Sequence, residues 1–437
     1  MSAGYGKLLS ALKSLLPGER LSLIGRVVRF IRRQRFVLSG AFVWATVMSR
    51  FSPGTPGFGA ARQWYSALTG RSCEPRPFQL RFKAEEAVSL FEEAFESAVA
   101  PWRECRPIPH ALSRHVVDIV VIDSTLIKVA DSLRRKFKGL RNVPAQIKAC
   151  LTISAVGSLP LFAELAPGTK NDPLLFPPVH LFRKGTLWLF DLGFLAFERL
   201  RELLQGGHLF ICRIKTVSNP VIVAVRKGPS WARKAVREHE AIRLRSLLPA
   251  GKRIGRQWDL DVSITSHKAG CGVPLAVRVV IVPGRDGEQL GYFTNLRPDT
   301  WCPVAVREAY RLRWQIELVF KEMKQHLNLE SIPTKDPFAA QVFVWASLIA
   351  LAVSRVISRC LAPIASLVGL AASIRPALIS RALRSTIRLL IPLLRGGNAR
   401  AGVPPQMFFD DLKAQAKSTG GPRKDSFARL AEMLGPA

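Results

Sequence analysis

The chain has 437 residues, of which 48% are hydrophobic, so it can bury a sizeable core and is not a wholly disordered protein. Its 64 Lys and Arg residues stand against 32 Asp and Glu, which gives a formal net charge of +32. Such a surplus is typical of proteins that bind a polyanion, because each cation set against a phosphate releases counterions. An enzyme for small acidic metabolites would need only a local basic pocket. Nucleic acid is therefore the first candidate partner, and an anionic membrane surface is the second.

The seven cysteines and seven histidines are scattered along the chain. The sequence contains neither a CxxC pair nor an HExxH motif, which argues against a zinc module, and the odd cysteine number argues against a disulfide framework. We therefore expect a reducing, cytoplasmic setting.

Two charge-free stretches raise the question of a membrane span. Pro337–Ser354 and Cys360–Ile374 are separated by Arg355 and Arg359. Each falls short of the roughly 20 apolar residues that a transmembrane helix needs. The sequence predicts buried helices of a soluble domain and no membrane partner.

Residues 1–60 carry nine basic residues and one acidic residue, Glu19. Apolar positions recur at helical spacing from Leu8 to Ile31, with Leu23 and Val27 on the expected inward stripe and Arg26, Arg29 and Arg33 off it. The pattern predicts a basic, helical, DNA-binding region over 1–60. A helical linker region is expected over 61–114, including an amphipathic helix over Ala84–Ala100.

From Val116 the pattern changes to short apolar runs broken by turns, which indicate strands. The strands are expected at Val116–Ile122, Ile147–Ser154, Leu159–Leu165, Leu187–Phe190 and Leu209–Ile214, with helices around Pro173–Phe182 and Phe197–Gln205. Further strands are expected at Val221–Val225, Leu275–Val282 and Tyr292–Leu296. We divide this part into a mixed α/β core over 115–214, a β-rich insertion over 215–300, helices over 301–355 and an Arg-rich helical region over 356–437.

Two carboxylates follow apolar runs within the expected core. Asp123 follows Val116–Ile122, and Asp191 follows Leu187–Phe190. A carboxylate at the end of a buried strand is held rigidly where a hard cation can reach it, although either one alone could start a turn or cap the next element. Asp118, Asp131 and Asp172 are the alternatives if either proves dispensable.

The segment from Tyr310 to Lys324 carries a third carboxylate. At 3.6 residues per turn, Tyr310, Arg313, Glu317 and Lys324 fall on one narrow helix face. The opposite face is a continuous apolar stripe formed by Leu312, Ile316, Val319, Met323 and Leu327. A solvated charged face explains the Lys and Glu but not the Tyr and the matched spacing, so we favour a functional face.

The spacing Tyr310-x2-Arg313-x3-Glu317-x6-Lys324 resembles the YREK motif of bacterial insertion-sequence transposases of the DDE, β-insertion, hairpin-forming, cut-and-paste type. Asp123-Ser124-Thr125 and Phe190-Asp191-Leu192-Gly193-Phe194 resemble the first and second aspartate regions of that family. The segments 210–215 and 292–296 resemble those that flank its β insertion. The resemblance covers about residues 115–355.

The resemblance implies an RNase H-like catalytic core, a mixed five-stranded sheet with helices, interrupted by the β-rich insertion and flanked by helical N- and C-terminal regions. It implies a catalytic, metal-binding triad of Asp123, Asp191 and Glu317 with two Mg²⁺, for which Mn²⁺ could substitute. All-oxygen carboxylate ligands suit Mg²⁺, and two such ions promote phosphodiester cleavage. Tyr310, Arg313 and Lys324 would contact DNA phosphates beside the cut.

The same resemblance implies double-stranded DNA partners, namely terminal inverted repeats and target DNA, a homodimer in a paired-end complex, and a place at the nucleoid in the bacterial cytoplasm. Hairpin chemistry in the family stacks a flipped base on an aromatic; Trp258, Tyr292 and Trp301 are candidates, although a core aromatic is the better explanation for each. Two other functions stay open: an RNase H-like host nuclease, and a non-catalytic or domesticated DNA-binding protein on the same fold.

Overall fold

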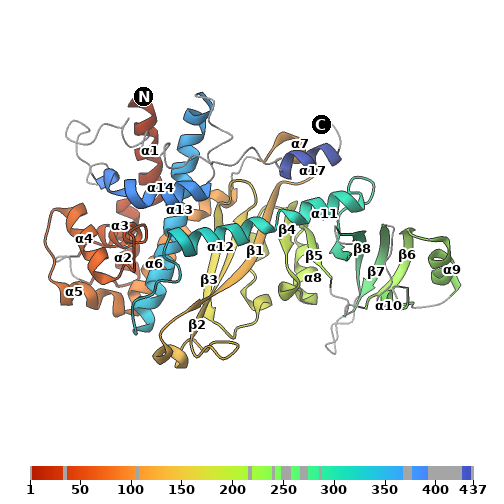
Figure 1. Cartoon of the computed structure of the whole chain (residues 1–437), viewed down its shortest axis with the longest axis horizontal. Helices are drawn as coiled ribbons and strands as arrows, with labels where there is room; N and C mark the ends of the chain where they lie inside the picture. Colours follow the sequence, from red (N-terminus) through yellow and green to blue (C-terminus); the bar gives the residue numbers. More distant parts are fainter. Residues whose placement is uncertain are drawn as a thin grey trace.

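The computed structural model describes residues 2–32, 37–104, 108–214, 219–238, 242–247, 257–265, 274–284, 288–367, 376–391 and 426–434. Figure 1 shows a helical bundle at one end, a long sheet crossing the middle and the insertion at the other end. Arg33 and parts of the Arg-rich C-terminal region, residues 368–375, 392–425 and 435–437, lie outside the described residues.

The N-terminal helices pack into the main hydrophobic core. They are α1 (Ser2–Leu15), α2 (Gly18–Val27), α3 (Ser39–Ser49), α4 (Phe58–Thr69), α5 (Pro75–Leu80), the 3-10 turn η1 (Arg81–Lys83), α6 (Glu85–Glu104) and α7 (His110–Ser113). Helix α3 is buried along nearly its whole length because most of its side chains are apolar. The expected inward stripe is wrong at Leu23 and Val27, which are 62% and 72% exposed. Helix α2 therefore presents part of its apolar surface, together with Arg26, to solvent.

A single long helix, α13 (Pro337–Leu367), runs through the bundle and contacts α1, α3 and α6. This helix contains the first charge-free stretch and the second as far as Leu367, and Arg355 between them forms a buried ion pair with Glu322. By length and composition Pro337–Cys360 could cross a membrane, yet 94% of its most apolar 18-residue window is buried inside the protein. The expectation of a buried helix is confirmed.

The sheet has nine strands in the order β3-β2-β1-β4-β5-β9-β8-β7-β6. Its first five strands are β1 (Asp118–Lys128), β2 (Gln146–Ser154), β3 (Pro160–Pro167), β4 (Thr186–Phe190) and β5 (Leu209–Arg213). Strands β1, β4 and β5 are parallel neighbours. On the other side of β1, β2 runs antiparallel to β1, and β3, antiparallel to β2, points the same way as β1. This order and these directions are those of an RNase H-like core, so the expected fold class is confirmed.

Alternating side chains of the central strands enter two different cores. In β1, Ile119 and Val121 join the core on the side of the helical bundle, and Val120 and Ile122 join the core on the opposite face. This period-2 pattern with both faces apolar is typical of strands buried between layers. By the same alternation, Asp123 falls on the bundle side of the sheet.

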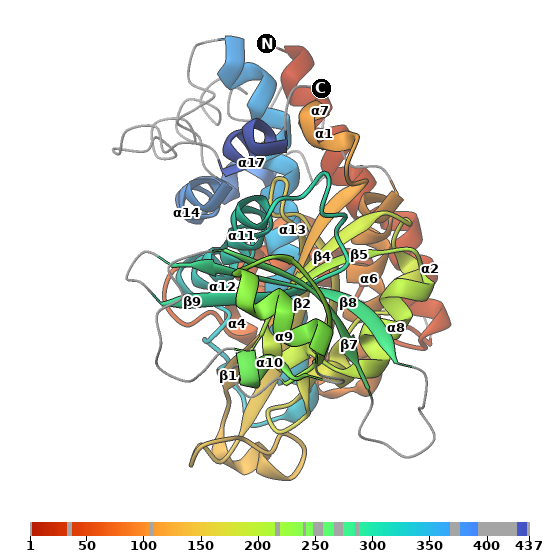
Figure 2. The same cartoon turned by 90° about the vertical axis from the view of Figure 1, so that its right-hand side faces the viewer.

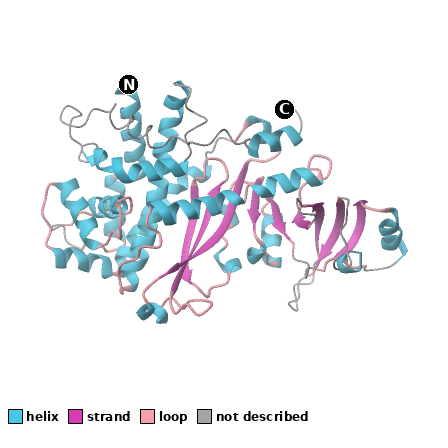
Figure 3. Cartoon of the chain, in the orientation of Figure 1, coloured by secondary structure: helices cyan, strands magenta, loops and turns pink. Residues whose placement is uncertain are grey.

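The insertion continues the sheet. Its strands are β6 (Val221–Lys227), β7 (Trp258–Ile264), β8 (Leu275–Pro283) and β9 (Gln289–Thr294), with the helices α9 (Ser230–Glu238) and α10 (Leu244–Leu247) beside them. Strand β9 pairs antiparallel with β5, which brings the two segments that flank the insertion side by side. Figure 2 views the molecule from this end, and Figure 3 shows the strands as one series. The sequence did not predict β7, and the sheet is therefore longer than the five core strands.

The connections around the core differ from expectation at one place. Residues 173–182 form two 3-10 turns, η3 (Asp172–Leu175) and η4 (Val179–Leu181), rather than an α-helix, because Pro177 and Pro178 cannot donate helix hydrogen bonds. Turn η5 (Leu192–Phe194) and α8 (Phe197–Gln205) follow β4, and the expected bounds of α8 are confirmed. After β9 come α11 (Pro303–Arg311), α12 (Trp314–His326), α13, α14 (Pro376–Thr386), η7 (Ile387–Leu390) and α17 (Ser426–Leu434).

Candidate active site

A guanidinium joins two of the three expected catalytic carboxylates. Arg313 Nη1 lies 3.2 Å from Asp123 Oδ2, and Arg313 Nη2 lies 2.5 Å from Glu317 Oε1. Asp123 belongs to β1 and Glu317 to α12, two elements in contact across the bundle side of the sheet. The structure therefore brings together residues that are 194 positions apart in the chain, around one cationic group.

Asp123 was expected to end its strand, and that expectation is wrong. Strand β1 continues to Lys128 because residues beyond Asp123 still pair with β2, including Ser124 with Cys150. The parallel pairing with β4 nevertheless stops at Ile122, opposite Phe190. Asp123 therefore stands where the parallel part of the sheet ends.

Asp191 directly follows β4 and begins the turn η5, so its expected position after a strand is confirmed. Because Ile122 pairs with Phe190, Asp123 and Asp191 are the next residues of two neighbouring parallel strands. Carboxyl ends of parallel strands meet at one edge of a sheet, which is where α/β proteins place ligands. Asp191 is exposed at this edge.

Burial raises the pKa of Asp123 to about 6, from an ordinary value of 3.8. The hydrogen bond from the Ser124 backbone N–H and the charge of Arg313 oppose the rise, while the negative charges of Asp191 and Glu317 add to it. The three carboxylates thus share one electrostatic environment. Their mutual repulsion favours a bound cation between them.

The residues at this edge fit a hard divalent cation. Their donors are carboxylate oxygens, which suit Mg²⁺, and the Arg313 guanidinium occupies the position of a positive charge between Asp123 and Glu317. Across the described part of the chain, no three His, Cys, Asp or Glu side chains lie close enough to hold one ion as they stand. Binding a metal would thus require Arg313 to release its carboxylates and the acids to draw together.

The expected single helix from Tyr310 to Lys324 is divided. Helix α11 ends at Arg311 and α12 begins at Trp314, because the backbone N–H groups of Arg313, Gln315 and Ile316 bond three residues back rather than four. The apolar stripe is confirmed, since all five of its residues, Leu312, Ile316, Val319, Met323 and Leu327, are buried.

The other face is less open than expected. Tyr310 is 8% exposed, its ring centre lies 5.0 Å from that of Tyr292, and burial raises the pKa of its hydroxyl. Arg313 lies over the Tyr310 ring at 5.8 Å. Lys324 is partly exposed and its Nζ lies 2.8 Å from Glu330 Oε1. Only Glu317, Lys324 and part of Arg313 can therefore meet a ligand from solvent without rearrangement.

A polar network that the sequence did not single out as a unit supports this edge. Asp172 Oδ1 accepts hydrogen bonds from Ser124 Oγ at 3.0 Å and from the buried Lys148 at 2.8 Å. The other oxygen of Asp172 lies against Gly193, where an added Cβ would come within 3.2 Å of it. Asp172 thus binds the residue after Asp123 and lies beside the turn that follows Asp191. The only sequence signal was its place among the alternative acids.

The other alternative acids do not join the site. Asp118 starts β1 and is buried beside Ser154, and Asp131 is exposed in η2 (Asp131–Arg135).

The aromatics proposed for base stacking lie in the core. Trp258, Tyr292 and Trp301 are 2%, 3% and 3% exposed, which supports the core explanation for each. The exposed aromatic beside the site is Trp314, at 58%, one turn before Glu317 on α12. The sequence analysis did not predict that Trp314 is exposed, because it considered only the apolar stripe and the face opposite to it.

Asp123 and Asp191 follow the paired parallel part of β1 and β4, and Glu317 comes from a helix in contact with β1; the core that carries them is RNase H-like. Residues 115–353, more than half of the chain, match the protein family described as "Transposase DDE domain", and the chain belongs to that family. The family membership supports the resemblance to bacterial insertion-sequence transposases; membership of the YREK group within it stays a prediction.

Curated relatives align with most of the chain. It is 24% identical to the transposase for insertion sequence element IS231F of Bacillus thuringiensis subsp. israelensis over 373 residues, which cover 78% of this chain and 77% of the relative. It is 20% identical to the transposase for insertion sequence element IS1151 of Clostridium perfringens over 386 residues, 80% of each chain. A solved structure of a piggyBac transposase synaptic complex with hairpin DNA is 10% identical, with a TM-score of 0.48, covering 96% of this chain and 87% of that one.

Proposed function

We propose that this protein is a DDE transposase that cleaves DNA at transposon ends with Mg²⁺ and transfers the cut strands into target DNA. One observation carries the proposal: Asp123 and Glu317 converge on a single cationic group beside Asp191, at the edge of the sheet, in a chain of the DDE transposase family. The relatives named above are transposases of insertion sequences, which favours the same function.

Asp123, Asp191 and Glu317 would hold two Mg²⁺, with Mn²⁺ as a substitute. When bound, the two ions activate a water or a 3′-hydroxyl as nucleophile and stabilise the leaving oxygen. Asp123 has a pKa of about 6, so its ionised fraction grows across the range from pH 5 to 7. Binding of cations by this site is therefore expected to strengthen as pH rises through that range.

Arg313 and Lys324 would bind the phosphates beside the cut. An arginine has five N–H donors in a planar fork, and those of Arg313 that now bind Asp123 and Glu317 would become free for a phosphate once Arg313 releases the two carboxylates. Tyr310 stays a predicted DNA contact. Its buried ring supports Arg313 from beneath, and reaching a phosphate would require it to move.

The partners follow from charge and family. A net charge of +32 favours binding of a long DNA duplex. The protein would bind the terminal inverted repeats in one step and the target DNA in another. A homodimer joining two ends is proposed because strand transfer of an element needs both ends at once.

The test is incubation of the purified protein with Mg²⁺ and a DNA fragment carrying the flanking ends of its own gene, beside Asp123→Ala and an EDTA control. Products are resolved on a denaturing gel. A nick or hairpin at the element end, lost in both controls, is the expected result. Cleavage without preference for the end would favour the host nuclease, and tight binding with no cleavage would favour the non-catalytic DNA-binding protein.

A further inference from the structure

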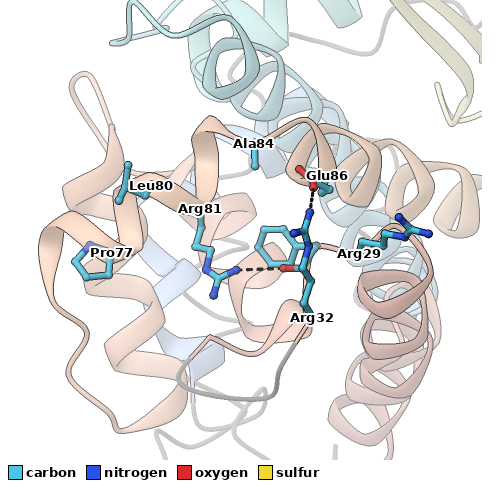
Figure 4. A pocket seen from close by; sticks show the side chains of 8 residues that line it. Arg29, Arg32, Pro77, Leu80, Arg81, Ala84 and Glu86 are labelled. Carbon is cyan, nitrogen blue, oxygen red and sulfur yellow. Dashed lines mark hydrogen bonds and ion pairs between the residues drawn. The ribbon is translucent and has the colours of Figure 1, made fainter.

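A pocket of about 720 Å³ lies in the N-terminal bundle, away from the three carboxylates. Its walls come from the turn after α2 and from the segment that joins α5 to α6, and they include Arg29, Arg32, Arg81, Leu80 and Glu86. Figure 4 shows the three arginines around this pocket. Three cations against one carboxylate give the pocket an excess of positive charge.

The arginines are held in three different ways. Arg81 Nη1 donates to the Phe30 carbonyl at 3.2 Å, which fixes the α2 turn against the α5–α6 segment. Arg32 pairs with Glu86 at 3.2 Å, but the Arg32 side chain is 76% exposed, so solvent screens the pair and it contributes little to stability. Arg29 is exposed. Two of the three guanidinium groups can therefore turn to a ligand at small cost.

Arg29 stands at a backbone position that favours glycine. Its φ is 61°, in the left-handed region, and its N–H bonds the carbonyl of Arg26 to close the end of α2. A side chain with a Cβ costs about 1 kcal/mol there. This conformation ends α2 and leaves the Arg29 side chain exposed at the wall of the pocket.

The start of α6 forms one wall of the pocket. This 20-residue helix begins at Glu85, and Ala84, just before it, lines the pocket. Glu85 and Glu86 in its first turn offset the partial positive charge of the helix end, so the positive potential comes from the arginines. Glu86 lies in the same first turn and pairs with Arg32, so an anion entering the pocket would compete with Glu86 for that arginine.

From this arrangement we infer that the pocket binds phosphodiester groups of duplex DNA through Arg29 and Arg32, outside the catalytic site. The inference rests on the proposed function for the identity of the polyanion. It assigns the N-terminal region one defined contact surface, and it makes the contact independent of base sequence, because guanidinium groups on phosphates read no base edge.

The experiment measures binding of full-length protein to two duplexes of equal length, one carrying the gene's own flanking end and one of unrelated sequence, by fluorescence anisotropy between 50 and 200 mM NaCl. The variants are Arg29→Gln, Arg32→Gln and Glu86→Gln. Glutamine removes the charge of each arginine and of Glu86 while it keeps a polar side chain. Each phosphate contact accounts for about a 3.5-fold loss of affinity over this salt range, from a slope of about 0.9 per contact.

Arg29→Gln and Arg32→Gln should each weaken binding to both duplexes and lower the slope of log K against log salt by about 0.9. Glu86→Gln breaks the same ion pair as Arg32→Gln but frees the arginine, so it should bind both duplexes at least as tightly as the wild type. Equal weakening by Arg32→Gln and Glu86→Gln would show a purely structural pair and overturn the inference. So would unchanged binding by the arginine variants, or weakening confined to the own-end duplex.

Failure of this inference is distinguishable from failure of the proposed function. If the wild type binds and cuts its own ends while the arginine variants behave like it, only the pocket assignment falls. If the wild type binds neither duplex, the DNA function itself falls.

Discussion

Replacing Asp123 by Asn should stabilise the protein, and by an amount that depends on pH. The folded-state pKa of Asp123 is about 6 against an ordinary 3.8, a difference of roughly two pKa steps at about 1.4 kcal/mol each. Because the pKa is higher in the folded state, the stability contributed by this carboxyl is fully present below pH 3.8 and is lost as pH rises through about 6. Asparagine carries no charge at any of these pH values. Its side-chain oxygen can keep the 2.8 Å hydrogen bond from the Ser124 N–H, whereas its NH2 group cannot accept the bond from Arg313, which keeps Glu317 as its partner.

The expected gain in the free energy of unfolding is about 3 kcal/mol at pH 8 and about 1.5 kcal/mol at pH 5. The measurement is urea unfolding of wild type and Asp123→Asn at both pH values, with the exposed Asp131→Asn as a control that should differ from wild type by less than about 0.5 kcal/mol at each. An Asp123→Asn variant that is less stable than wild type at pH 8, or equally shifted at both pH values, would refute the reasoning.

Three further predictions concern the site and its support. Glu322→Gln should destabilise the fold by about 3–5 kcal/mol, because it leaves the buried Arg355 without its counter-ion, and the double variant Glu322→Leu/Arg355→Met should recover most of that in urea unfolding. Glu317→Gln should abolish metal-dependent cleavage while the far-UV circular dichroism and unfolding midpoint stay close to wild type; full cleavage would remove Glu317 from the triad. Arg313→Ala and Lys324→Ala should each weaken binding of the element end and flatten its salt dependence by about one contact, and unchanged anisotropy titrations would take them off the DNA surface.

Much of the core could be predicted from the sequence because its signal is local. Val116–Ile122 and Leu187–Phe190 are apolar enough to identify strands buried on both faces, and the acids that follow them are easy to see. The apolar stripe beneath Glu317 has a helical period and is buried as expected. The family resemblance then implied that these strands and the Glu317 helix form one core, which the periodicity of the sequence could not show.

The features that were missed depend on contacts between distant segments. Arg313 meets Asp123 only because α12 crosses the sheet on the face to which alternation assigns Asp123. The resemblance to the YREK motif implied that Arg313 contacts a phosphate, and it did not predict an ion pair between Arg313 and the expected catalytic acids. Asp172 lies in a turn with no periodicity. Its hydrogen-bond donors, Ser124 and Lys148, come from the neighbouring strands β1 and β2.

The continuity of the sheet was missed although a local signal was present. Strand β7 alternates strictly between apolar residues (Trp258, Leu260, Val262 and Ile264) and polar ones (Asp259, Asp261 and Ser263), which is the period-2 pattern of a strand. Asp259 is buried because Arg278 of β8 binds it through two hydrogen bonds of 2.7 Å. An aspartate lowers the strand propensity of a segment, and only the partner strand β8 explains why Asp259 can be buried.

The most direct test of the central claim, that Asp123, Asp191 and Glu317 hold the metal ions that cut DNA, is a metal swap at Asp191. Asp191→Cys replaces a hard oxygen ligand by a softer thiolate, which Mn²⁺ accepts more readily than Mg²⁺. Cleavage of the element end by this variant is compared in Mg²⁺ and in Mn²⁺, with Asp131→Cys as the control that should cut in both. The account predicts that Asp191→Cys fails in Mg²⁺ and recovers in Mn²⁺. Cleavage in Mg²⁺ at the wild-type rate would contradict it.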